Sequence, residues 1–238
     1  HTLLDYDGLL PSYIYMSDGK GSDMRMARNI QIPAKSVVVA DRGYIDFFLL
    51  HKWNTEEIDF VVRCKENVKF IGYEEKELPE NRSSNILKDE KVLLEEPKTR
   101  KSYAKKLRMV TVYDEKNKTT MYLLTNNFNW TAQTISELYR QRWQIEIFFR
   151  DLKSLFKIKT FIGTSPNAVL IQIWTAMITM LILKYLKQIS EYKWSLSNLI
   201  AFIRMNLFVK ISLMEWLNHP FKRWEELEEE LNPQLKLF

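Results

Sequence analysis

Cysteine is nearly absent from this chain, because Cys64 is the only one among 238 residues. A single thiol excludes a disulfide framework and any zinc site built from several cysteines, and it fits a reducing cytoplasm. Histidine is also rare, with three residues, and His51 and His219 stand alone in the sequence. We therefore assign no catalytic role to either of them. The sequence also shows no secretory signal.

The main apolar run is too short to span a bilayer. It covers residues 168–183, is sixteen residues long and is interrupted by Gln172, Thr175 and Thr179. A transmembrane helix needs about 20 predominantly apolar residues. We therefore predict that the run forms a buried core helix, with a membrane span as the alternative. The chain is accordingly expected to be cytoplasmic, without a membrane partner.

The composition supports a folded protein with a mildly basic surface. Hydrophobic residues make up 46% of the chain and aromatic residues 13%, which is enough for a substantial core. The length of 238 residues predicts one large domain, or one domain with an insertion. The net charge of +5 and the pI near 9.1 mildly favour a polyanionic partner.

Apolar patterns divide the chain into three parts. Residues 1–63 alternate between strand and helix patterns, which indicates an α/β sheet. The expected elements are two strands around Asp7-Gly8, a buried central strand, a helix and a further strand, at 1–17, 35–40, 46–53 and 58–63. Residues 64–126 show apolar–polar alternation and predict a β-rich insertion. Residues 127–238 are mostly helical and begin with one long helix, capped by Asn129 or Thr131.

The segment from Tyr139 to Lys153 follows the pattern Y-x2-R-x3-E-x6-K. At about 100° per residue, one continuous helix would place these four side chains on a single narrow stripe. A carboxylate flanked by an aromatic ring and two cations suits a phosphodiester site, where the acid holds a metal ion and the cations hold phosphates. The alternative is that Glu146 is a surface residue paired with Arg142 or Arg150 at i±4 spacing.

Asp41 is a second candidate acid. It directly follows the expected buried strand, in the segment Asp41-Arg42-Gly43-Tyr44. Ligands of open α/β sheets bind beyond the carboxyl ends of strands, and a carboxylate there can coordinate Mg²⁺. The alternative is that the Asp41 side chain caps the helix that follows.

Together, the 139–153 pattern, the Asp41 segment and the strand at 60–63 resemble a DDE transposase of the insertion sequence 4 family. The resemblance covers roughly residues 1–187. It implies an α/β fold with a ribonuclease H-like mixed sheet and flanking helices, in which 64–126 is inserted before the final catalytic helix. It also implies metal-dependent cleavage at transposon ends and strand transfer, carried out on double-stranded DNA by a homodimer.

The same resemblance implies a role for each candidate residue. Asp41 and Glu146 would be catalytic residues that bind two divalent ions, Mg²⁺ or Mn²⁺. Five residues would contact DNA phosphates near the cut end: Tyr139, Arg142, Lys153, Arg42 and Arg63. Arginine offers a fork of donors to a phosphate and lysine a point charge.

A third acid is expected from the family but is not found among these residues. Asp5 and Asp7 flank a turn and are interpreted as turn residues. We therefore expect that the first strand and its aspartate lie before residue 1, and that this chain alone is inactive. Two other functions stay open, a catalytically dead DNA-binding remnant and a metal-dependent DNA nuclease on the same fold.

A basic run lies within the expected insertion. It extends from Lys98 to Arg108 and contains six cations and no acid in eleven residues. The run indicates either a solvated hairpin loop or a contact with the DNA backbone. Some relatives hold a flipped base with a tryptophan in this region, but residues 64–124 contain none. Phe70, Tyr73 and Tyr103 are possible substitutes, among which the sequence does not select.

Overall fold

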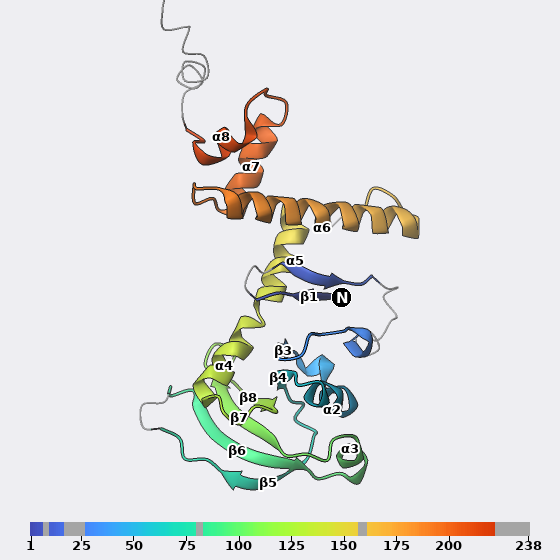
Figure 1. Ribbon diagram of the computed structural model, residues 1–238, viewed down its shortest axis with the longest axis vertical. Helices are drawn as coiled ribbons and strands as arrows, with labels where there is room; N and C mark the ends of the chain where they lie inside the picture. Colours follow the sequence, from blue (N-terminus) through green and yellow to red (C-terminus); the bar gives the residue numbers. More distant parts are fainter. Residues whose placement is uncertain (7–9, 17–26, 80–82, 157–160, 222–238) are drawn as a thin grey trace, which may run out of the picture. The chain divides into compact units, whose positions relative to one another are not determined.

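The computed structural model describes residues 1–6, 10–16, 27–79, 83–156 and 161–221 (Figure 1). The chain divides into two compact units. The first consists of His1–Leu4 and Pro11–Glu146, and the second of Asp5–Leu10 and Ile147–Phe238. The first unit contains a hairpin and a six-stranded sheet, whereas the second is mainly helical.

The hairpin confirms the two strands predicted at the start of the chain. Strand β1 (Thr2–Leu4) pairs antiparallel with β2 (Pro11–Ile14). The ladder is supported at its open end, where the amino group of His1 donates to the Tyr15 carbonyl at 2.9 Å. The expected Asp7-Gly8 turn lies outside the described residues.

The large sheet contains strands from residues 1–63 and from residues 64–126. Its strands have the order β3-β4-β8-β7-β6-β5, and all neighbours are antiparallel except β3 and β4. The strands are β3 (Val37–Ala40), β4 (Asp59–Arg63), β5 (Phe70–Glu75), β6 (Ile86–Leu94), β7 (Leu107–Asp114) and β8 (Thr119–Thr125). Because β8 pairs with β4, the strands of residues 64–126 continue the same sheet. Their interpretation as an insertion stays a prediction.

The expectation of a buried central strand at 35–40 is wrong in one respect. Strand β3 pairs only with β4 within the described residues, so it is an edge of this sheet. Val37 is 43% exposed, whereas Val38 and Ala40 are buried. The continuous apolar run predicted burial, but a run of this kind carries no information about how many neighbours a strand has.

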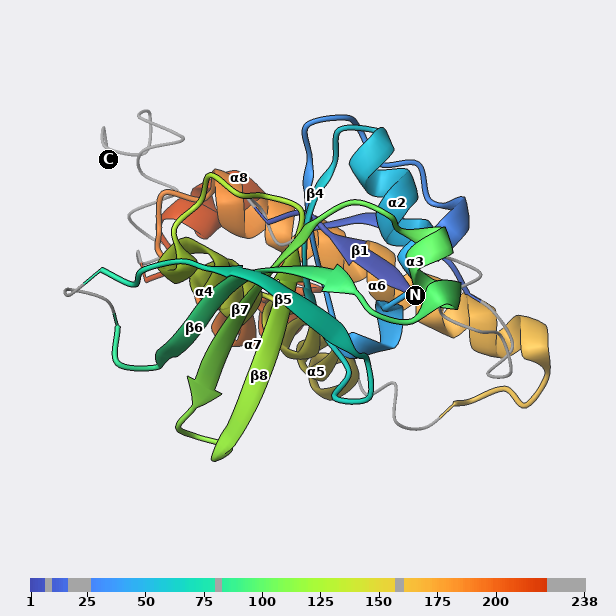
Figure 2. The same cartoon turned by 90° about the horizontal axis from the view of Figure 1, so that it is seen from below.

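Helices cover the two faces of the sheet. Successive residues of a strand point to opposite faces, and on β4 Phe60 and Val62 join one core cluster while Val61 joins the other. Helix α2 (Phe47–Thr55) covers the first face, beside α3 (Pro97–Ser102), as Figure 2 shows. Helix α4 (Ala132–Gln141) covers the second face through Ile135 and Tyr139. The sheet is therefore the middle layer of three.

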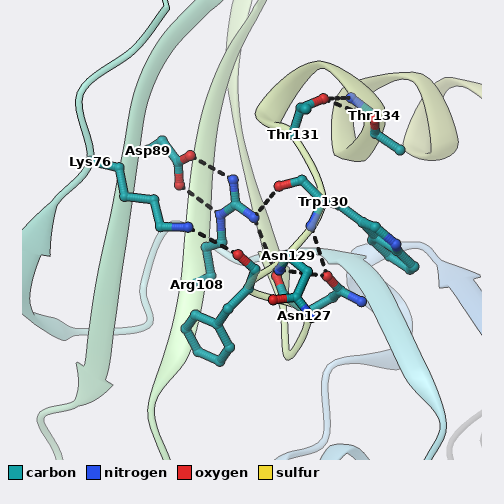
Figure 3. Close-up of polar contacts among 9 residues, drawn as sticks. Lys76, Asp89, Arg108, Asn127, Asn129, Trp130, Thr131 and Thr134 are labelled. Carbon is teal, nitrogen blue, oxygen red and sulfur yellow. Dashed lines mark hydrogen bonds and ion pairs between the residues drawn. The ribbon is translucent and has the colours of Figure 1, made fainter.

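A buried ion pair ties the sheet to the start of α4. Arg108 on β7 donates through Nε and Nη2 to the carboxylate of Asp89 on β6, at 2.8 and 2.7 Å (Figure 3). Its Nη1 donates to the carbonyls of Trp130, at 2.6 Å, and Asn127. Thr131 then caps α4 by accepting from the Thr134 amide. Arg108 belongs to the basic run that the sequence analysis interpreted as a solvated loop or a DNA contact. In the structure its side chain is fully buried and has a structural role.

The prediction of one long helix to about residue 156 is wrong, because the backbone tightens after α4. The amides of Arg142, Trp143 and Ile145 donate to the carbonyls three residues earlier, which is the pattern of a 3₁₀ turn. A second helix, α5 (Gln144–Leu155), then begins. A prediction at a uniform 100° per residue cannot detect this change, because each residue of a 3₁₀ turn rotates by about 120°.

In its described residues, the second unit contains the rest of α5 and three further helices, α6 (Pro166–Ile189), α7 (Leu196–Asn206) and α8 (Leu213–Asn218). Trp194, Leu199 and Trp216 lie at the centre of its core. The prediction of a buried core helix holds for one side of α6 only, since its buried side chains are Ala176, Met177, Met180 and Leu183. Within the described ranges, α6 is long and apolar enough to cross a membrane by length and composition alone, a property shared by many core helices.

Candidate active site

Asp41 and Arg63 lie side by side at the carboxyl ends of two parallel strands. In the register of β3 and β4, Ala40 is opposite Val62, so the next residue on each strand is Asp41 and Arg63. The Asp41 carboxylate accepts from the Arg42 amide at 2.5 Å and caps the 3₁₀ helix η1 (Arg42–Tyr44). Asp41 therefore caps only this short turn, whereas the helix predicted at 46–53 is capped by Asp46. The cap occupies Oδ1 of Asp41 and leaves the second oxygen for another partner.

Helix α4 brings Tyr139 and Arg142 into the electrostatic reach of these strand ends. Burial raises the pKa of Tyr139, Arg142 lowers it, Asp41 raises it and Arg63 lowers it, in that order of size. The Arg142 guanidinium lies 5.7 Å from the centre of the Tyr139 ring. Four of the candidate residues thus form one charged neighbourhood, drawn from β3, β4 and the end of α4.

Glu146 joins this neighbourhood through Arg142. Nη1 of Arg142 donates to Oε1 of Glu146 at 2.5 Å, across the turn between α4 and α5. Burial alone would lower the pKa of Arg142, but the hydrogen bond to Glu146 and the charges of Tyr139, Glu146 and Asp41 raise it overall. The expected i,i+4 pair is therefore present, and the charge of Asp41 acts on the same guanidinium.

Two polar atoms of this pair are buried without a partner among the described residues. They are Oε2 of Glu146 and Nε of Arg142. A buried carboxylate oxygen that lacks a hydrogen bond costs free energy unless a cation or a donor satisfies it. Together with the second oxygen of Asp41, it offers the hard donors that Mg²⁺ and Mn²⁺ prefer. The donors fit a divalent ion, although the described residues contain no group of three acidic, histidine or cysteine side chains that could hold one.

The other two candidates are placed differently. Arg42 is exposed and begins η1, directly after Asp41. Lys153 is exposed in the last turn of α5 and belongs to the second unit. Its relation to Asp41 therefore stays a prediction, whereas the single stripe that the sequence pattern predicted on one continuous helix is wrong, because α4 and α5 are separate helices.

An open cavity of about 490 Å³ adjoins the strand ends. Arg42 and Arg63 line it, together with one acid, Glu66, and with Lys65, Thr120 and Tyr122, which the sequence analysis missed. The role of the two arginines as phosphate contacts stays a prediction. Lys65 was within reach of prediction, because it is two residues after Arg63 and alternate residues of an extended chain share a face. Thr120 and Tyr122 reach the cavity through the pairing of β8 with β4, for which the sequence shows no local signal.

Comparison with known proteins gives a consistent result. Residues 1–182 match the family model described as the transposase DDE domain. The chain is 29% identical over 172 residues to a probable transposase for insertion sequence element IS5377 from Geobacillus stearothermophilus, covering 72% of this chain and 45% of that protein.

Two further relatives are presumed transposases by their names. The protein y4zB of Sinorhizobium fredii is 30% identical over 186 residues, covering 77% of this chain and 52% of the relative. A protein for insertion sequence element IS4SA from Synechocystis is 26% identical over 211 residues, covering 87% and 59%. The chain thus spans about half the length of the relatives that it matches.

Proposed function

The chain belongs to the family of the transposase DDE domain, and on that premise we propose that it is the catalytic region of a DNA transposase. The proposed reaction is cleavage of DNA at the ends of a mobile element, followed by transfer of the freed strand into target DNA. The specific resemblance to the insertion sequence 4 family, which rests on the Y-x2-R-x3-E-x6-K pattern, is part of this proposal.

The observation that carries the proposal is the charged neighbourhood at the ends of β3 and β4. Asp41 and Glu146 are far apart in the sequence, yet both act on the guanidinium of Arg142 and raise its pKa. Two acids that are far apart in the sequence but influence the same arginine suit phosphodiester chemistry better than a solvated surface pair. An i,i+4 pair alone would account for Arg142 and Glu146 but not for the influence of Asp41.

We propose that Asp41 and Glu146 hold the divalent ions, Mg²⁺ or Mn²⁺, of a two-ion site. Arg142 fixes the Glu146 carboxylate through Oε1 and leaves the buried Oε2 free as a ligand. The η1 turn fixes Asp41 in the same way, through the amide of Arg42. When bound, divalent ions activate the attacking hydroxyl and neutralise charge on the phosphoryl oxygens.

The cations of the site are proposed to hold the DNA strand. Arg42 and Arg63 line the cavity at the strand ends, and their forked guanidinium donors match phosphate oxygens. Arg142 and Tyr139 would add a cation and a hydroxyl, and Lys153 a point charge. These residues orient the phosphodiester, so that the reacting hydroxyl approaches in line with the bond that breaks.

The remaining features of the family are proposals of the same kind. Residues 1–63 and 127–238 would form a ribonuclease H-like core, with 64–126 as the inserted strands. A third carboxylate, from a residue outside the described part of the chain, would complete the acidic set. The active species would be a homodimer on paired double-stranded DNA ends.

A strand-transfer assay tests the proposal. The protein that carries this chain would be incubated with Mg²⁺, target plasmid and pre-cut DNA ends from the encoding element. Joined products are expected, and they should disappear in EDTA. Nicked DNA without joined product would reject transposition in favour of a metal-dependent nuclease. Binding of the ends without any cleavage would favour a DNA-binding remnant, which the absence of a third acid from the described site makes the main competing function.

A further inference from the structure

A second basic surface lies apart from the residues of the candidate active site. It consists of five exposed cations on and directly after α3, which we call the α3 basic surface: Lys98, Arg100, Lys101, Lys105 and Lys106. None of the five forms an ion pair with an acid in the described part of the chain. The sixth cation of the run, Arg108, is buried with Asp89 and takes no part.

The backbone beneath this surface is well anchored, which argues against a loose solvated loop. Tyr103 is 1% exposed and packs edge-on against His51, with 5.7 Å between ring centres. Leu107 is fully buried in the same core cluster. The amide of Tyr103 closes the end of α3 by donating to the Thr99 carbonyl at 3.0 Å. Lys105 and Lys106 are therefore held between two buried side chains, and Lys98, Arg100 and Lys101 lie on the helix that ends at the first of them.

Helix stability explains only part of this charge. Arg100 and Lys101 lie in the last turn of α3, where cations favourably oppose the negative end of the helix dipole. That account does not apply to Lys98 in the first turn, nor to Lys105 and Lys106 beyond the helix. The helix dipole thus accounts for none of these three cations.

Lys106 also contacts an exposed ring. Its ammonium lies 3.9 Å from the ring centre of Tyr73 on β5, and Tyr73 is 57% exposed. The charge of Lys106 also acts on Glu74, but the pKa of Glu74 is lowered mainly by the hydrogen bond from Lys91, and the charge of Lys106 contributes less than the charge of Lys91. The carboxylate is thus engaged mainly by another lysine, and Lys106 keeps capacity for an external anion.

We propose that the α3 basic surface binds the phosphate backbone of double-stranded DNA, without reading its sequence and without a metal ion. Its cations are complementary to a duplex, which carries one negative charge per about 1.7 Å of axis. Its side chains offer donors only, which suits phosphate oxygens and not the mixed donors and acceptors of base edges. The choice of DNA rests on the proposed function, but the chemistry of Asp41 and Glu146 is not needed.

Fluorescence anisotropy with the whole chain tests this proposal. The probe is a labelled 30-base-pair duplex of arbitrary sequence, titrated in EDTA over a range of KCl concentrations. The test variant carries K98Q, R100Q, K101Q, K105Q and K106Q. The matched control removes five other exposed positive charges and carries K35Q, K116Q, K118Q, K187Q and K193Q.

The test variant should bind at least tenfold more weakly than the unmodified chain at about 100 mM KCl. Its slope of log affinity against log salt should flatten by about 2–4 units, because each lost phosphate contact removes about 0.9. The control should stay within threefold of the unmodified chain. Equal losses in both variants would mean that net charge alone is responsible, and no loss in the test variant would remove the surface from the interface. Either result overturns the proposal.

Two further arms make the outcome specific. In the first, a double-stranded RNA of the same length replaces the DNA. If the test variant loses as much affinity for the RNA as for the DNA, the proposal of DNA as the intended partner is rejected. Thermal unfolding by circular dichroism shows whether the test variant folds, and if it does not, K98Q/R100Q/K101Q and K105Q/K106Q are measured separately. If strand transfer fails but the test variant still loses affinity for DNA, the catalytic proposal is rejected and the proposal for the α3 basic surface is retained.

Discussion

The buried pair of Arg108 and Asp89 is predicted to hold the sheet and α4 together. Their side chains are 2% and 5% exposed, so neither charge is solvated by water. Arg108 is also the donor for two carbonyls of the 126–130 loop that leads into α4. The perturbation is Arg108→Met, which keeps an unbranched apolar stem of similar reach and removes every donor.

Arg108→Met should destabilise the first unit by about 3–5 kcal/mol, because it leaves the Asp89 carboxylate buried without its cation. The Trp130 carbonyl, which accepts at 2.6 Å, loses its donor as well, and an unsatisfied buried group costs about 1–3 kcal/mol. These costs overlap, so the total is expected near 5 kcal/mol. Since domains have about 5–15 kcal/mol of stability in all, the variant should be close to unfolding.

The double variant Arg108→Met/Asp89→Leu separates the two costs. Both charges are then replaced by apolar groups, a change that is often close to neutral for an ion pair. The carbonyls of Trp130 and Asn127 still lack a donor, so the double variant should lose only about 1–3 kcal/mol. The double variant should therefore be more stable than the single one.

Urea unfolding followed by tryptophan fluorescence measures these differences. Trp53 and Trp130 report on the first unit, and the transitions of the two units are fitted separately because a single two-state value is not defined for both. Arg108→Met costing less than about 1 kcal/mol would refute the calculation. A double variant no more stable than the single one would refute the claim that the uncompensated charge dominates.

Three further predictions concern the candidate site and the core. Glu146→Ala in the protein that carries this chain should abolish cleavage and leave end binding within a few-fold in a gel-shift assay, because it removes a proposed metal ligand and no phosphate contact; unchanged cleavage would reject the assignment. Lys153→Ala should weaken DNA binding and flatten the salt slope by about one unit, whereas an unaltered slope would mean that Lys153 is merely exposed. Burial raises the pKa of the Cys64 thiol from 9.0 to about 11, so its contribution to stability is complete below pH 9 and lost as the pH rises to 11. The free energy of unfolding, measured in urea at pH 8 and pH 11, should therefore fall by up to about 2–3 kcal/mol less in Cys64→Ala than in the unmodified chain. An identical fall in both proteins would contradict the burial argument.

Local patterns predicted those parts of the site that local chemistry determines. The i,i+4 pair of Arg142 and Glu146 and the position of Asp41 at a strand end both follow from short-range spacing, and both are present. Thr131, one of the two predicted caps, also starts α4 as expected. In each case a few neighbouring residues are sufficient to fix the geometry.

Long-range pairing was beyond prediction for a physical reason. Arg108 looks like part of an exposed basic run, and only the pairing of β7 with β6 places it against Asp89. The edge position of β3 likewise depends on which strands join the sheet, and its apolar run is compatible with either an edge or a centre. A charge or a strand can be assigned its environment only when its partner in space is known.

The break between α4 and α5 changes how the sequence pattern should be interpreted. The pattern predicted that four side chains lie on one face of a single helix: Tyr139, Arg142, Glu146 and Lys153. The 3₁₀ turn instead advances each of its residues by about 20° more than an α-helix would, so everything after Arg142 is rotated relative to α4. Arg142 lies at this junction and reaches both ways, to the Tyr139 ring and to the Glu146 carboxylate. The residue that connects the two parts of the pattern is therefore Arg142, at the turn between the helices. Its guanidinium donates to Glu146 on α5, and its pKa also responds to the charge of Asp41 at the end of β3.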